Sequence, residues 1–292
     1  MSEGPITAPA EIRSAVVLTH TQPEQTSDAL RTALATAAKA DCAIYASDEE
    51  INKHSGAAGS IKTLGTLEGQ PDLCLVLGGD GTILKALRTY AGTEVPVFGF
   101  NYGTVGFLAA VERDELAAGL ESAFSSEFEV MRMPGLEATI DGTTSLAFND
   151  FTFIRRPHGR VADLAYRLGG KEVGHVRCDG LVAATPAGST GYNLANQGPI
   201  LAWGVEGYVV SFIAPHTLTA RPLVVAPKDV LSVTNAAGRD AVDVVLDGTH
   251  LGELASGATV EIRFRNDVAR LGQLAGANFY RRIRDKFGRL AH

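Results

Sequence analysis

A glycine-rich turn after an apolar run at residues 73–77 is the first candidate site in this chain. The turn consists of Gly78, Gly79, Asp80, Gly81 and Thr82. A helix-forming stretch follows at once, and a strand, a glycine turn and a helix N-terminus together present backbone N–H groups and a partial positive charge to an anion. The spacing lacks residues that the Rossmann and Walker motifs require. The turn is therefore a candidate phosphate loop of another type.

Asp80 adds a second chemical function to this turn. A carboxylate repels phosphate, and two unit charges about 4 Å apart cost about 4 kcal/mol at an effective dielectric of about 20. Either a magnesium ion between the groups offsets this repulsion, or Asp80 faces the hydroxyl that accepts the phosphoryl group and takes its proton. The simpler alternative is a tight turn in which Asp80 caps the helix.

Two further polar clusters occur later in the chain. Asn149 and Asp150 place an amide and a carboxylate side by side, which suits two vicinal ribose hydroxyls or the amino edge of adenine. Residues 185–193 combine hydroxyls, glycines and an aromatic ring, which suits phosphate, ribose and a base. Taken separately, the first cluster is typical of a turn and the second of a helix cap. Their joint presence favours a nucleotide site.

Short apolar strands alternate with helices in the first part of the chain. We expect strands at 14–19, 42–45, 73–77 and 95–100, helices at 27–39, 82–90 and 113–124, and a loop at 55–60. This alternation predicts an α/β domain with a parallel, Rossmann-like sheet covered on both faces. A second glycine-rich stretch, residues 99–108, follows the last strand, so both glycine-rich loops are expected at the carboxyl edge of the sheet, where such sheets bind ligands.

From about residue 128 the pattern changes to short strands separated by turn signals. The dipeptides at 141–142, 169–170 and 237–238 (Asp-Gly, Gly-Gly and Ala-Gly) favour turns between strands, and helices become scarce apart from a short one expected after Gly188. Near the C-terminus, the spacing of Phe279, Ile283 and Phe287 predicts an amphipathic helix at 278–290 that packs back on one of the domains. We therefore expect an α/β domain at 12–128, a mostly β domain at 129–271 and a C-terminal helix and tail at 272–292.

Composition excludes several classes of protein. The 292 residues carry a net charge of -7, which argues against a nucleic-acid partner because phosphate backbones are held by clustered cations. Cys42, Cys74 and Cys178 form neither a disulfide framework nor a zinc motif and are expected in the core. No apolar run is long enough to cross a membrane and the start does not resemble a signal peptide, so we expect a cytoplasmic protein. The seven histidines lack metal-ligand spacing, which argues against a transition-metal site. Ser189 lacks a GxSxG elbow, which argues against a serine hydrolase.

With these motifs in this order, the chain resembles the NAD kinase family over residues 14–264. The glycine-rich turn is shared with other kinases, including 6-phosphofructokinases, whereas the segment 185–192 in a separate β domain is far more restrictive. The resemblance implies a phosphotransferase with an alcohol acceptor, which moves a phosphoryl group from ATP or polyphosphate to the 2′-hydroxyl of the adenosine ribose of NAD and makes NADP. It also implies a divalent cation such as Mg²⁺, a phosphofructokinase-like first domain, and a homodimer or homotetramer.

The resemblance further assigns roles to individual residues. Asp80 is implied as the catalytic residue, on a phosphate loop that contains Gly78, Gly79 and Thr82. The implied substrate-binding residues are Gly81, Asn149, Asp150, Arg160, Arg177, Asp179, Thr190, Gly191, Tyr192, Asn193 and Thr249. Asp150, Gly191 and Thr249 stand where the family usually has Glu, Ala and Gln. We expect these differences to affect substrate affinity and the preference between NAD and NADH more than the reaction itself.

Two other functions remain open at this stage. A lipid kinase of the diacylglycerol type shares the glycine-rich turn, but it would need an apolar mouth or a basic membrane face, and the acidic composition gives little sign of either. A non-catalytic dinucleotide sensor would keep the nucleotide site without the reaction. The residues also leave open the phosphoryl donor and feedback control by NADPH.

Overall fold

The structure is a computed structural model that describes residues 6–54, 59–277 and 279–288. Among these residues the chain forms two compact units: Pro134–Asp267, here called the β unit, and the residues before and after it, here called the α/β unit. Strands β8 (Glu129–Ile140) and β19 (Thr259–Gln273) each contribute residues to both units. The domain limits expected at 128 and 271 stay a prediction. The first falls directly before β8, and the second falls inside β19.

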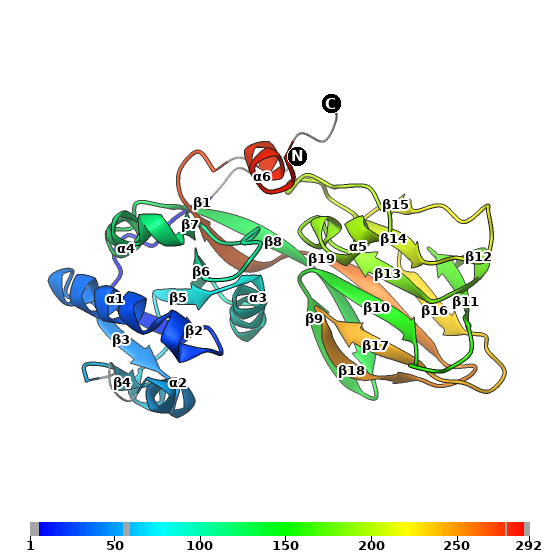
Figure 1. Ribbon diagram of the computed structural model, residues 1–292, viewed down its shortest axis with the longest axis horizontal. Helices are drawn as coiled ribbons and strands as arrows, with labels where there is room; N and C mark the ends of the chain where they lie inside the picture. The colour runs from blue at the N-terminus through cyan, green and yellow to red at the C-terminus, as the bar shows by residue number, and fades with distance from the viewer. Residues whose placement is uncertain (1–5, 55–58, 278, 289–292) are drawn as a thin grey trace. The chain divides into compact units, whose positions relative to one another are not determined.

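The α/β unit contains short strands that alternate with helices, as the sequence pattern predicts (Figure 1). Besides parts of β8 and β19, its elements are β1 (Ile6–Thr7), β2 (Ser14–Thr19), η1 (Pro23–Gln25), α1 (Ser27–Lys39), β3 (Ala43–Ala46), α2 (Asp48–Lys53), β4 (Lys62–Thr63), η2 (Leu64–Thr66), β5 (Leu73–Gly78), α3 (Asp80–Thr89), β6 (Pro96–Asn101), β7 (Val111–Glu112), η3 (Arg113–Glu115), α4 (Leu116–Phe124) and α6 (Phe279–Phe287).

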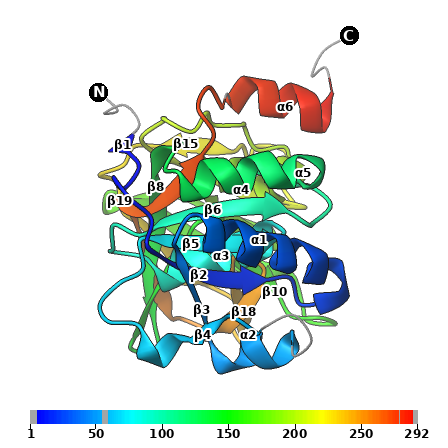
Figure 2. The same cartoon turned by 90° about the vertical axis from the view of Figure 1, so that its left-hand side faces the viewer.

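The strands of this unit form a parallel sheet in the order β19-β6-β5-β2-β3-β4, and β7 pairs with β6. Every residue of β5 and β6 is buried, as expected for strands covered on both faces. Helices α1 and α4 lie over one face (Figure 2), and α3 lies over the other (Figure 1). The predicted α/β fold is confirmed.

The predicted helices of this unit lie at or close to the expected ranges. Helix α1 spans the predicted residues and buries Ala29, Leu30 and Ala33 at helical spacing against the sheet. Helix α3 begins at Asp80, two residues earlier than the expected 82, because the carbonyl of Gly79 already accepts N–H bonds from the third and fourth residues after it. The helix predicted at 113–124 opens with the 3-10 turn η3 and continues as α4. Part of the loop predicted at 55–60, residues 55–58, lies outside the described residues.

The β unit is built almost entirely of antiparallel strands. Besides parts of β8 and β19, its elements are β9 (Thr143–Ala147), β10 (Asp150–Arg155), β11 (Ala162–Leu168), β12 (Lys171–Cys178), β13 (Gly180–Ala184), η4 (Gly188–Thr190), α5 (Tyr192–Ala195), β14 (Tyr208–Ile213), β15 (Leu223–Val225), β16 (Leu231–Asn235), β17 (Val242–Leu246) and β18 (Thr249–Leu254).

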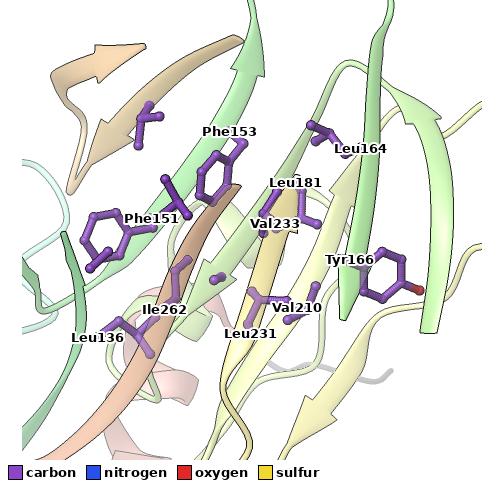
Figure 3. Packing of buried hydrophobic residues seen from close by; sticks show 14 of the residues in the cluster. Leu136, Phe151, Phe153, Leu164, Tyr166, Leu181, Val210, Leu231, Val233 and Ile262 are labelled. Atoms are coloured by element: carbon purple, nitrogen blue, oxygen red, sulfur yellow. The ribbon is translucent and has the colours of Figure 1, made fainter. Parts of the chain in front are cut away.

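These strands form two layers with a hydrophobic core between them. One layer has the order β12-β11-β16-β19, with β8 and β9 beyond β19, and the other has the order β15-β14-β13-β10-β17-β18. Figure 3 shows Phe151 and Phe153 of β10 facing Leu164 of β11 and Ile262 of β19 across this core. The alternation of buried and partly buried residues along β11, β16 and β17 reflects the two-residue period of a strand with one buried face.

Two of the three predicted turns close hairpins. Asp141 and Gly142 connect β8 to β9 with φ angles of 50° and 79°, and Gly169 and Gly170 connect β11 to β12 with 55° and 79°. Positive φ at both central residues is the requirement of the tight hairpin turn. The dipeptide at 237–238 lies instead in a connection between layers, because β16 pairs with β11 and β19 and not with the following strand.

Two further predicted helices and the three cysteines complete the described elements. The short helix after Gly188 is present as η4 and α5, and the C-terminal helix is present as α6, with residues 278, 289 and 290 of its predicted range outside the described part. The three cysteines are free and buried, which confirms them as core residues. No helix within the described ranges is long and apolar enough to cross a membrane.

Candidate active site and nucleotide pocket

The predicted phosphate loop is a tight junction between β5 and α3. Strand β5 ends at Gly78 and α3 begins at Asp80. A Cβ atom at Gly78 would lie 2.6 Å from Oγ1 of Thr82, and one at Gly79 would lie 3.2 Å from Cα of Gly103. A side chain at Gly78 would therefore displace Thr82, and one at Gly79 would crowd the neighbouring loop. The N-terminus of α3 thus follows directly on two closely packed glycines at the end of a strand, which is the geometry expected of a phosphate loop.

The carboxylate of Asp80 is held by the second glycine-rich loop. Oδ2 accepts a hydrogen bond from the backbone N–H of Phe107 at 2.9 Å, and Oδ1 accepts one from the N–H of Leu108 at 3.0 Å. The two loops also meet where the N–H of Tyr102 donates to the carbonyl of Gly78 at 3.0 Å. The sequence predicted both loops at one edge of the sheet, and their hydrogen bonds confirm that they lie together.

The β unit contains a cavity of about 390 Å³. It is lined by Asn149, Asp150, Thr152, Ile154, Tyr192, Val245, Asp247 and Gly248. The lining combines carboxylates, an amide and a hydroxyl with apolar side chains and a tyrosine ring. Its volume falls in the range of small-molecule pockets, and a few convergent polar groups on an apolar wall are typical of a ligand site.

The start of β10, which carries Asn149 and Asp150 into this cavity, is held by Asp247. The Asp247 carboxylate accepts N–H bonds from Phe148 at 3.2 Å, from Asn149 at 2.7 Å and from Asp150 at 3.1 Å. In return, the N–H of Asp247 donates to the carbonyl of Asp150 at 3.0 Å. The backbone that presents the two polar side chains is therefore fixed from the neighbouring hairpin of β17 and β18.

Asp150 is buried, with only 6% of its surface exposed. Burial raises the pKa of its carboxyl group to about 6; the hydrogen bond from Thr152 opposes this shift and the negative charge of Asp247 adds to it. Oδ1 accepts that bond from the Thr152 hydroxyl at 2.9 Å. A buried carboxyl group with a raised pKa at the wall of a cavity is characteristic of a functional site.

The segment 185–193 packs directly against Asn149. The N–H of Thr185 donates to the Asn149 carbonyl at 2.9 Å, and the Thr185 hydroxyl donates to the carbonyl of Phe148 at 2.5 Å. A Cβ atom at Gly188 would lie 2.0 Å from the Asn149 carbonyl oxygen, so only glycine fits there. The hydroxyl of Ser189 donates to the Pro186 carbonyl at 2.6 Å. Most of the polar groups of this segment thus shape the turn itself.

The structure brings three of the predicted substrate-binding residues together around the cavity: Asn149, Asp150 and Tyr192. Tyr192 is 39% exposed, and its pKa is raised by partial burial and by the negative charges of Asp150 and Asp179. Asp179 forms an ion pair with Arg155 at 2.6 Å.

Other predicted residues lie away from the cavity wall. The Thr190 hydroxyl donates to the carbonyl of Ala187 at 3.0 Å, and the Asn193 amide is buried and donates to the carbonyl of Ser189 at 3.0 Å. Gly191, Arg160, Arg177 and Thr249 are exposed and do not line it. In the α/β unit, Gly81 is exposed at the start of α3.

Sequence reasoning did not select Thr152, Ile154, Val245, Asp247 and Gly248 as site residues, although all five line the cavity. Thr152, Ile154 and Val245 read as ordinary strand residues. Asp247 and Gly248 form an Asp-Gly pair between two strands, with φ angles of 45° and 80°, and such a pair indicates a hairpin turn. The turn signal was therefore available, but the reach of the Asp247 carboxylate to a strand about a hundred residues earlier depends on the tertiary fold.

Comparison with solved structures identifies the class of this fold. The structure matches that of yeast NADH kinase complexed with NADH with a TM-score of 0.84 at 20% identity, over 99% of this chain and 96% of that one. It matches an NAD kinase from Archaeoglobus fulgidus in complex with ATP with a TM-score of 0.69 at 24% identity, over 94% and 97% of the two chains. The chain therefore has the two-domain fold of the NAD and NADH kinases.

Sequence comparison places the chain more closely. Residues 18–128 match the ATP-NAD kinase N-terminal domain, and residues 148–270 match the ATP-NAD kinase C-terminal domain. The NAD kinase of Symbiobacterium thermophilum is 34% identical over 83% of this chain and 90% of its own length, and that of Rhodopirellula baltica is 34% identical over 74% and 71%. The chain belongs to the NAD kinase family, which confirms the resemblance found from its motifs.

Proposed function

We propose that this protein transfers the terminal phosphoryl group of ATP to the 2′-hydroxyl of the adenosine ribose of NAD and so makes NADP. The observation that carries the proposal is the Asp80 carboxylate at the glycine-rich turn, oriented by the N–H groups of Phe107 and Leu108. Each carboxylate oxygen has two lone pairs, so Asp80 can still accept a hydrogen bond from a substrate hydroxyl. Family membership supplies the identity of that substrate.

In the proposed reaction, Asp80 accepts the proton of the 2′-hydroxyl as its oxygen attacks the terminal phosphorus of the donor. A bond forms between the ribose oxygen and this phosphorus, and the bond from the phosphorus to the bridging oxygen of ADP breaks. The transition state of phosphoryl transfer is loose, so positioning and charge neutralisation supply most of the catalysis. Gly78, Gly79 and Thr82 would shape the backbone that receives the phosphates, with Gly81 against the substrate.

A divalent cation fits this site as a partner of the donor phosphates. Among the described residues, no group of three or more His, Cys, Asp and Glu side chains is placed to hold a metal ion. This fits magnesium, which usually binds to substrate phosphates with one or two carboxylates and keeps several waters. The donor phosphates would carry the ion, and Asp80 would remain the acceptor of the hydroxyl proton. When bound, the ion neutralises the negative charge that accumulates on the phosphates.

The cavity of the β unit would bind part of the dinucleotide. Asn149 and Asp150 offer an amide and a carboxylate for ribose hydroxyls or an adenine edge, and Tyr192 offers a ring for stacking. The charge of Asp179 acts on Tyr192, and Thr190 belongs to the same segment 185–193 as Tyr192. Arg160, Arg177 and Thr249 are exposed and would contact substrate or a neighbouring subunit. We assign these residues to substrate binding on the strength of the family resemblance.

We further propose a cytoplasmic homo-oligomer. The cytoplasmic location is supported by the three free, buried cysteines, since a reducing compartment keeps such thiols unpaired. The oligomer is an expectation from the family. Light scattering coupled to size-exclusion chromatography would measure the subunit number, and a monomeric mass at working concentration would contradict it.

A coupled assay tests the proposed function. Purified protein is incubated with NAD, magnesium and either ATP or polyphosphate, and the NADP formed is detected with an NADP-specific dehydrogenase. We expect NADP formation with ATP, and we expect Asp80→Asn to retain the fold and NAD binding while losing most turnover. Wild-type protein that binds NAD without forming NADP from any donor would contradict the proposed reaction and favour a dinucleotide sensor. Full turnover by Asp80→Asn would contradict the role of the carboxylate.

A further inference from the structure

Helix α6 holds the loop that orients Asp80. Arg282, on this helix, donates to the carbonyl oxygen of Phe107 at 2.8 Å and also to that of Ala109. Gln273, at the end of β19, donates to the carbonyl between them at 3.0 Å and contacts Arg282 through its own side-chain oxygen. Three successive carbonyl groups of the loop are therefore bound by two side chains. All of these residues belong to the α/β unit.

The geometry of the peptide group carries the effect of Arg282 to Asp80. The carbonyl of Phe107 and the N–H of Leu108 belong to one planar peptide unit and point in opposite directions. Because Arg282 fixes this carbonyl from one side, the N–H is fixed toward Oδ1 of Asp80 on the other side, 3.0 Å away. Rotation of this one peptide would break both hydrogen bonds at once.

Further contacts of α6 restrain the loop at both ends. The ring of Phe107 lies 6.0 Å from that of Phe279 and 5.9 Å from that of Phe287, measured between centroids. At the other end, Lys286 donates to Glu112 at 2.6 Å, and Glu112 accepts from the side chain of Asn101 at 2.8 Å. The helix thus contacts the segment 107–112 at both ends, and Glu112 extends this connection to Asn101.

The electrostatic environment of Arg282 includes the carboxylate that it helps to orient. Burial lowers the pKa of the Arg282 guanidinium, and the negative charges of Asp80 and Glu112 raise it. A half-buried cation that remains charged in this position needs acceptors for its N–H groups, and the loop carbonyls supply them.

We propose that Arg282 is a positioning residue for the phosphoryl-transfer step: through the peptide units of residues 107–109 it holds Asp80 in the orientation that receives the proton of the acceptor hydroxyl. This inference rests on the catalytic role proposed for Asp80. Arg282 itself need not touch either substrate, so its loss should affect turnover more than binding.

The test combines substitutions at Arg282 and Asp80 in the full-length protein. Arg282→Gln removes the charge and the planar fork, and we expect kcat to fall about a hundredfold, the size of effect that a displacement of about 1 Å produces, with KM for NAD changed less than about threefold. Arg282→Lys keeps the charge but not the fork, so it should recover only part of this loss. Arg284→Gln, an exposed arginine of the same helix, is the matched control and should keep wild-type kcat.

The double variant separates positioning from a general loss of structure. If Arg282 acts through Asp80, adding Arg282→Gln to Asp80→Asn should lower the residual kcat by less than about twofold, because the two residues act as a unit. A further fall of the same size as in the single variant would overturn the proposal, and so would wild-type kcat in Arg282→Gln. If that variant does not fold, Gln273→Leu serves instead, with an expected loss of about tenfold in kcat alone. Unimpaired Asp80→Asn would refute the catalytic assignment separately.

Discussion

The carboxylate of Asp247 accepts the backbone N–H of Asn149 at 2.7 Å, and this bond joins the turn between β17 and β18 to the start of β10. The same carboxylate also accepts from the residues on either side of Asn149. Hydrogen bonds to a charged acceptor are shorter and stronger than neutral ones. Asp247 therefore fixes the backbone from which two predicted substrate-binding side chains project.

Asp247→Asn should weaken both this corner of the fold and substrate binding. The amide can accept fewer hydrogen bonds and turns an N–H₂ group toward backbone donors, so we expect a loss of about 2 to 3 kcal/mol in unfolding free energy and a rise of about tenfold or more in KM for NAD. Urea unfolding and steady-state kinetics would measure the two effects. Asp243→Asn on the preceding strand β17, whose carboxylate pairs with the partly exposed Arg156, should cost less than about 1 kcal/mol. Equal effects of both substitutions would contradict the role of Asp247.

Gly188 and Gly191 form a second matched pair. A Cβ atom at Gly188 would lie 2.0 Å from a backbone oxygen, whereas one at Gly191 would lie 3.4 Å from its nearest neighbour. Gly188→Ala should therefore lower the unfolding free energy by about 3 kcal/mol, since backbone must move, and Gly191→Ala should change it by less than about 1 kcal/mol. Denaturant titration of the two variants tests the difference. Comparable stability of both would show that the turn is looser than these distances imply.

The buried carboxyl group of Asp150 predicts a pH-dependent stability. Its folded-state pKa of about 6 lies above the ordinary aspartate pKa of 3.8, so the unfolded chain loses its proton first as the pH rises. The stability contributed by this residue is therefore fully present below the unfolded-state pKa, is lost as the pH rises to about 6, and stays lost above it.

Asp150→Asn removes this titration. Between about pH 4 and about pH 7, the unfolding free energy of the variant should rise relative to wild type by about 2 kcal/mol, on the order expected for a shift of this size. Denaturant titrations at the two pH values give the comparison. A constant difference between variant and wild type would mean that the carboxyl group titrates normally.

Removal of the divalent cation should abolish activity without affecting stability. Magnesium usually binds to substrate phosphates and keeps several waters, so the proposed ion is expected to arrive with the donor phosphates. Excess EDTA should therefore stop NADP formation, magnesium should restore it, and the melting temperature of the protein alone should shift by less than about 1 °C. A large fall in melting temperature on chelation would indicate a structural metal instead.

The sequence by itself determined the elements and the family. The alternation of apolar runs with helix-forming stretches predicted the α/β unit, and the residue ranges of β2 and α1 match the structure at both ends. These elements follow from local periodicity, which a single sequence records. The glycine-rich turn and the segment 185–193 identified the family for a related reason. Each is a local motif with a glycine in a close contact, against the Thr82 side chain at Gly78 and against the Asn149 backbone at Gly188.

Only the tertiary structure decided how distant residues support these motifs. Three sets of hydrogen bonds join positions between 27 and 175 residues apart. Asp247 accepts from the backbone of Asn149, Asp80 accepts from the N–H groups of residues 107 and 108, and Arg282 donates to the carbonyl of Phe107 in the same loop. Each partner taken alone has an ordinary local interpretation, as a turn residue, a strand end or a solvated helix face. Such contacts depend on the path of the chain between them, and that path is set by the pairing of strands and the packing of the two cores.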